Sequence, residues 1–142
     1  MLDLWLILHF LGVALGVGTG FAMMTLGIST KDLPPADRGA FMRRASVIGL
    51  NGSIGLALLL GSGIGLLLTR GVDVVMAWGG KWFHIKLTLV VILIGIFGYM
   101  QVLVRQSRSA DGAAAAARIP LISRLMLLVA VSVIISAVLA FH

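Results

Sequence analysis

Four long stretches of apolar residues dominate this chain of 142 residues and constrain what it can fold into. Each stretch is long enough to cross a hydrocarbon core of about 30 Å, which takes roughly 20 residues of α-helix. The expected helices span residues 4–25, 46–69, 82–104 and 121–141. Strands of a membrane barrel would be about ten residues long with alternating polarity, and the sequence lacks that pattern. The sequence therefore predicts an all-α, integral membrane four-helix bundle that forms a single transmembrane domain over residues 1–142.

The composition agrees with a membrane environment. Hydrophobic residues make up 60% of the chain, and only 11% of the residues are charged, which is about half the share in an average soluble domain. A soluble fold of this length could not bury so much apolar surface. The chain has no cysteine, which excludes disulfides, thiolate metal sites and cysteine nucleophiles. A lipid bilayer is therefore the expected environment.

The basic residues predict which side of the membrane each connection faces. The formal net charge is +6, and eight of the eleven Lys and Arg residues lie in or beside the first and third connections: Lys31, Arg38, Arg43, Arg44, Arg105, Arg108, Arg118 and Arg124. The positive-inside rule then places these connections in the cytoplasm, so that the helices run up-down-up-down and both termini are extracytoplasmic. Trp5, Trp78 and Trp82 fall at the outer boundary, as an aromatic belt would. We therefore expect a multi-pass protein of a bacterial plasma (inner) membrane, and we attribute the positive charge to orientation rather than to nucleic-acid binding.

Two histidines lie inside the predicted spans at comparable depth. His9 is in the first span and His84 in the third. These spans run in the same direction, so both side chains fall within ~10 Å of the outer boundary. At ~100° per residue, Gly12 and Gly16 share the helix face of His9, and Gly95 shares the face of His84. An imidazole from each of two helices above a glycine-lined slot suits one b-type haem with two axial histidines.

Three basic residues near the same boundary are candidates to act with such a cofactor. Lys86 points roughly 200° away from His84. Its ammonium either reaches the outer headgroups or meets an anionic group, such as a propionate or a carboxylate substrate, where it would be catalytic. Arg70 and Lys81 lie at the same surface, and each either anchors its helix there or contacts a haem propionate.

The same residues allow other interpretations. Glycines four residues apart also suit close helix packing, and an intramembrane histidine can simply bridge two helices, so the chain could be a non-enzymatic assembly subunit. His142 could join the two other histidines in a copper or zinc site. The glycine stripes also allow a homodimer. A proton-coupled exporter is disfavoured, because the chain has no Glu and no Asp in the middle of a span.

Parts of the first and third spans resemble a known family. The third-helix signature of the HemJ-type membrane proteins is similar to the run Lys81–Leu87 (KWFHIKL), and their N-terminal Leu-His segment is similar to Leu8-His9-Phe10. These are small helical membrane proteins that resemble haem-binding protoporphyrinogen oxidases and share a helical layout with CopD-like proteins. The resemblance implies that His9 is a haem ligand or active-site residue, that Lys86 is important, and that the partner is a porphyrin substrate or a redox protein.

Overall fold

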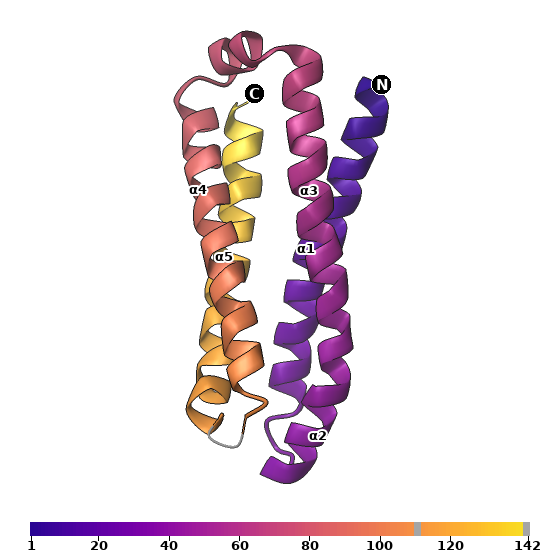
Figure 1. Ribbon diagram of the computed structural model, residues 1–142, viewed down its shortest axis with the longest axis vertical. Helices are drawn as coiled ribbons and strands as arrows, with labels where there is room; N and C mark the ends of the chain where they lie inside the picture. The colour runs from indigo at the N-terminus through magenta and orange to yellow at the C-terminus, as the bar shows by residue number, and fades with distance from the viewer. Residues whose placement is uncertain (110–111, 141–142) are drawn as a thin grey trace. The chain divides into compact units, whose positions relative to one another are not determined.

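The computed structural model describes residues 1–109 and 112–140, and within these ranges its regular structure is entirely helical (Figure 1). In chain order the elements are α1 (Leu2–Ser29), α2 (Pro35–Ala45), the 3-10 helix η1 (Ser46–Ile48), α3 (Gly49–Arg70), α4 (Val72–Gln106) and α5 (Ala113–Ala140). Four helical stretches in the described residues are long and apolar enough to cross a membrane, α2 and η1 being continuous with α3. The chain is therefore an all-helical, multi-pass membrane protein.

The helices extend beyond several of the predicted spans. One large difference is at α4, which begins ten residues before the predicted start at residue 82 because residues 72–79 are already helical. The alanine run 113–117, which precedes the predicted start of the last span, is part of α5. Residue 141, the predicted end of the last span, lies outside the described residues.

The chain divides into two compact units, Met1–Val75 and Met76–His142. In the first unit α1 packs against α3. The helix α2 precedes α3 and forms one continuous helical stretch with it. In the second unit α4 and α5 run alongside each other as a hairpin (Figure 1). The single transmembrane domain remains a prediction.

The residues in contact between α1 and α3 are spaced by three or four positions on each helix. The α1 residues on this contact, which we call the α1–α3 seam, are Trp5, His9, Gly12, Gly16 and Thr19. Their partners on α3 are, in the same order, Gly65, Ser62, Leu59, Gly55 and Gly52. The α3 numbers fall as the α1 numbers rise, so the helices are antiparallel. Spacing by three and four residues is that of a left-handed, coiled-coil-like crossing.

Glycines let the two backbones touch at the middle of the seam. A Cβ atom added to Gly55 would lie 2.6 Å from the Gly16 nitrogen and 2.9 Å from the Gly12 carbonyl oxygen. A Cβ atom on Gly12 would lie 2.9 Å from the Gly55 carbonyl oxygen. Lipid tails are as apolar as the helices, so association in a bilayer depends on close packing of this kind and on interhelical hydrogen bonds.

A backbone kink interrupts α4 near its start. Gly80 has φ 49° and ψ −144°, which is not a helical conformation. A positive φ of this kind is accessible to glycine and strained for residues with a Cβ atom. Phe83, one turn later, is buried against Gly79. The kink therefore fixes where the straight part of α4 begins and which face it turns inward.

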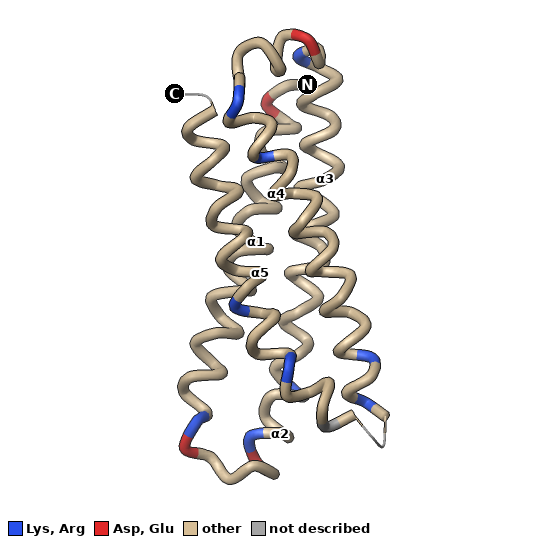
Figure 2. Tube along the Cα trace, turned by 90° about the vertical axis from the view of Figure 1, so that its left-hand side faces the viewer, with Lys and Arg blue, Asp and Glu red and all other residues tan. Residues whose placement is uncertain are grey.

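Most charged residues lie toward the ends of the long helices in each unit, whereas Lys86 in α4 and Arg124 in α5 lie further inside (Figure 2). In the first unit Lys31, Arg38 and Arg44 are exposed at the end that contains α2, and Arg70 is exposed at the other end of α3. This distribution suits helices whose centres lie in hydrocarbon, where a charge is costly.

The seam predicts a clear difference between two glycines of α3. Gly55→Ala should destabilise the protein by about 1–3 kcal/mol, because the added methyl group overpacks a backbone contact. Gly61→Ala is the matched control, since a Cβ atom there meets nothing within 4 Å; it should be neutral or slightly stabilising. Reversible unfolding of the detergent-solubilised protein measures both. Equal stabilities of the two variants would contradict the seam.

Candidate functional site

His9 lies on the α1–α3 seam and forms the hydrogen bond that links its two helices. The Nδ1 atom of His9 is 2.9 Å from the Oγ atom of Ser62, across 53 positions of sequence. The ring also passes over Gly63, where an added Cβ atom would lie 3.7 Å from the Cε1 atom of His9. The imidazole is therefore held at its Nδ1 side by α3 and is only partly accessible.

Ser62 is one of the most enclosed residues in the described part of the chain, with 2% of its surface exposed. Its hydroxyl donates to the Leu58 carbonyl oxygen one turn earlier, at 2.5 Å. This back-bond to the helix is a common arrangement for serine in membrane helices. Both the buried hydroxyl and the imidazole are thus hydrogen-bonded, as polar groups in a bilayer need to be.

Ser62 is not among the residues that the sequence predicts as functional. The sequence does contain a signal for Ser62. If α1 and α3 are aligned antiparallel with their glycines opposite each other, Ser62 is the α3 residue that lies opposite His9. That register becomes readable only when the pairing of α1 with α3 is known.

His84 has a different environment in the second unit. Its neighbour Phe83 is buried, and the next residue along the helix turns by about 100°, so that His84 is exposed. Its carbonyl oxygen accepts a hydrogen bond from the Thr88 hydroxyl at 3.0 Å. Gly95 is also exposed and open, since a Cβ atom there would meet nothing within 4 Å.

The predicted cofactor-binding glycines are therefore used in two ways. Gly12 and Gly16 face α3 and form the centre of the α1–α3 seam. Gly95 lies on an uncovered face of α4, and Gly98 is equally open. Contact of these glycines with a cofactor remains a prediction.

Of the basic candidates, Arg70 ends α3, Lys81 follows the kink of α4 at Gly80, and Lys86 lies six residues beyond that kink. Lys86 is partly buried in α4, two residues after His84. Lys81 places its ammonium 5.8 Å from the centre of the Trp82 ring, within the range of a cation–π interaction. Arg70 is exposed in the last turn of α3, where a positive charge interacts favourably with the negative end of the helix dipole. Each of these placements fits interfacial anchoring, and a role toward a bound anion remains a prediction.

No group of three or more potential metal ligands occurs among residues 1–109 and 112–140. His142, the third histidine of the copper or zinc alternative, lies outside these ranges, so that alternative remains a prediction.

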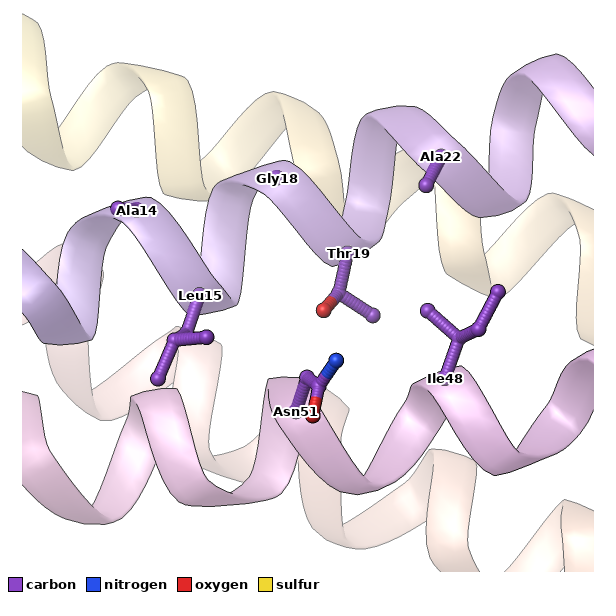
Figure 3. A pocket seen from close by; sticks show the side chains of 7 residues that line it. All are labelled: Ala14, Leu15, Gly18, Thr19, Ala22, Ile48 and Asn51. Carbon is purple, nitrogen blue, oxygen red and sulfur yellow. The ribbon is translucent and has the colours of Figure 1, made fainter.

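The first unit also carries a shallow groove of about 220 Å³ between α1 and the start of α3 (Figure 3). The Thr19 and Asn51 side chains point toward each other across it. The remaining lining residues are apolar or glycine: Ala14, Leu15, Gly18, Ala22 and Ile48. The groove contains no titratable group and lies away from His9 along α1, so it adds no reactive group to the site.

Comparison with models of protein families, with curated proteins and with solved structures finds no match to this chain. The resemblance to the HemJ-type family therefore stays a prediction, and the residues themselves carry the functional argument.

The two histidines should differ in their contribution to stability. His9→Ala removes the hydrogen bond to Ser62 and a side chain from the seam, which should cost about 1–2 kcal/mol. His84→Ala alters an exposed side chain and should change the free energy of unfolding by less than about 0.5 kcal/mol. Unfolding of the haem-free protein in detergent measures both variants. A larger loss for His84→Ala than for His9→Ala would contradict these environments.

Proposed function

We propose that the chain is a bacterial plasma-membrane protein that binds one b-type haem through His9 and His84 and performs one-electron redox chemistry. The observation that carries the proposal is the hydrogen bond between His9 and Ser62. Histidines that ligate a metal commonly use their second ring nitrogen to bond a neighbouring group, which fixes the orientation of the ring. His9 has such a partner, and the partner is buried.

The proposed orientation follows from the charges. With the four basic residues near α2 and those around the α4–α5 connection in the cytoplasm, the helices run up-down-up-down and both termini are extracytoplasmic. His9 then lies about two turns from the outer end of α1, and His84 about one turn beyond the kink at Gly80. The haem would accordingly be bound toward the outer leaflet.

The residues present fit a haem in unequal ways. His9 is held by α3 and supplies an oriented imidazole, whereas the glycines below it serve helix packing. His84 and Gly95 are exposed on α4, where a flat ring can approach the backbone closely. Lys86, Arg70 and Lys81 would meet the propionates or an anionic substrate such as a porphyrin. A bound haem supplies one-electron chemistry, and the chain supplies ligation, orientation and a medium of low dielectric constant.

A second candidate function is favoured by the open face of α4. Val91, Gly95 and Gly98 are uncovered on this helix, and small residues allow a helix of another protein to pack closely. The chain would then be a non-enzymatic assembly subunit in which His9 only links α1 to α3. A homodimer through the same face is the simplest version of this candidate.

An optical spectrum of the purified protein, expressed with ample haem, separates the two functions. We expect a Soret band and a reduced-minus-oxidised spectrum of a b-type haem, and we expect His9→Ala and His84→Ala each to abolish the difference spectrum. The matched control is Gly61→Ala, which lies in open space and should keep it.

Two results would contradict the haem proposal. A colourless protein that co-purifies with a stable partner would support the assembly subunit, and copper or zinc found by elemental analysis in place of iron would support the three-histidine site. A haem spectrum retained by both histidine variants would show that other residues ligate the iron.

A further inference from the structure

The single proton of the Ser62 hydroxyl determines which partner donates in the hydrogen bond between His9 and Ser62. The Oγ atom of Ser62 lies 2.5 Å from the Leu58 carbonyl oxygen and 2.9 Å from the Nδ1 atom of His9. A carbonyl oxygen can only accept a hydrogen bond, so the hydroxyl proton is committed to Leu58. The Oγ atom is then an acceptor toward His9, and the proton of that hydrogen bond belongs to Nδ1.

We infer that Ser62 is a positioning residue that holds neutral His9 in the Nδ1–H tautomer and so leaves the lone pair on Nε2. In neutral imidazole one ring nitrogen carries the proton and the other carries the lone pair. The opposite tautomer would place two lone pairs against each other across the seam. The hydrogen bond therefore selects which nitrogen of His9 acts as a ligand or proton acceptor.

The surroundings keep Ser62 in this role. Its rotamer is fixed by the back-bond to Leu58, and 2% exposure leaves no water to replace His9 as the partner. The backbone contact of Gly12 with Gly55, further along the seam, sets the separation of the helices. Gly63 leaves room for the imidazole ring to lie against α3.

The tautomer assignment depends only on the first unit, whereas a role of Nε2 toward an iron rests on the proposed function. Ser62 supports His9 in the way that outer-shell groups support metal-ligating histidines. Loss of such a partner typically lowers metal affinity roughly 10- to 100-fold.

The test is ¹⁵N NMR of histidine-labelled full-length protein in lipid nanodiscs, without haem, at a pH of about 8, where an ordinary histidine (pKa ~6.5) is neutral. Comparison with His9→Ala identifies the His9 signals. The wild type should show a protonated Nδ1 and a lone pair on Nε2. Ser62→Ala removes the acceptor and should shift the population toward the Nε2–H tautomer, which predominates in free neutral histidine.

Ser53→Ala is the matched control. Ser53 is on the same helix and its hydroxyl makes the same kind of back-bond, to the Gly49 carbonyl oxygen. This variant should leave the His9 signals unchanged. An Nε2–H tautomer in the wild type, or His9 signals that do not respond to Ser62→Ala, would overturn the inference.

Haem titration of the same variants separates this inference from the proposed function. With haem bound, Ser62→Ala should weaken haem affinity by roughly 10- to 100-fold and shift the midpoint potential, and Ser53→Ala should change neither. A wild type that binds no haem but shows the Nδ1–H tautomer overturns the proposed function and supports the role of Ser62. Normal haem affinity and potential in Ser62→Ala would overturn its positioning role.

Discussion

The close approach of the α1 and α3 backbones at Gly12, Gly16 and Gly55 is the constraint on which the first unit depends. A bilayer offers little hydrophobic driving force for helix association, so van der Waals contact and hydrogen bonding must supply the stability. At Gly12 and Gly55 even an added methyl group would push the helices apart. The bond between His9 and Ser62 exists because the backbones nearby are close enough for two short polar side chains to meet.

This seam also explains why a histidine is tolerated within an apolar helix. A polar group that lacks a partner in hydrocarbon is costly, whereas a hydrogen-bonded pair is not. The Ser62 hydroxyl forms hydrogen bonds both to the Leu58 carbonyl oxygen of its own helix and to the imidazole of His9 on the other helix. Ser132 on α5 illustrates the contrast, since its hydroxyl bonds the Leu128 carbonyl oxygen of the same helix. The two serines look alike in sequence and differ in what the neighbouring helix brings to them.

The number and approximate position of the apolar helices could be predicted from hydropathy, because crossing a bilayer requires a length that the sequence displays directly. The helix before Gly80 was missed, since eight residues between two glycines lack the length that identifies a span. Ser62 was missed for another reason. Its partner is 53 residues away on a different helix, and the pairing is set by packing that no local pattern records. The glycine stripe of α1 is a surface of close approach, whereas close approach to the stripe of α4 remains a prediction, and the pattern does not specify what approaches.

The two glycine-bearing faces make this last distinction concrete. On α1 the face of Gly12 is filled by the backbone of α3, while on α4 the face of Gly95 is open. The exposure of His84 is by itself inexpensive, because the residue lies only four positions after the kink, or about 6 Å along the helix, and an imidazole there can reach interfacial water. An exposed histidine close to a helix kink therefore requires no ligand to explain it. His9 is different, since it is partly buried and its orientation is fixed by a buried hydroxyl. The chemical argument for this protein accordingly rests more on His9 and Ser62 than on the apparent symmetry of the two histidines.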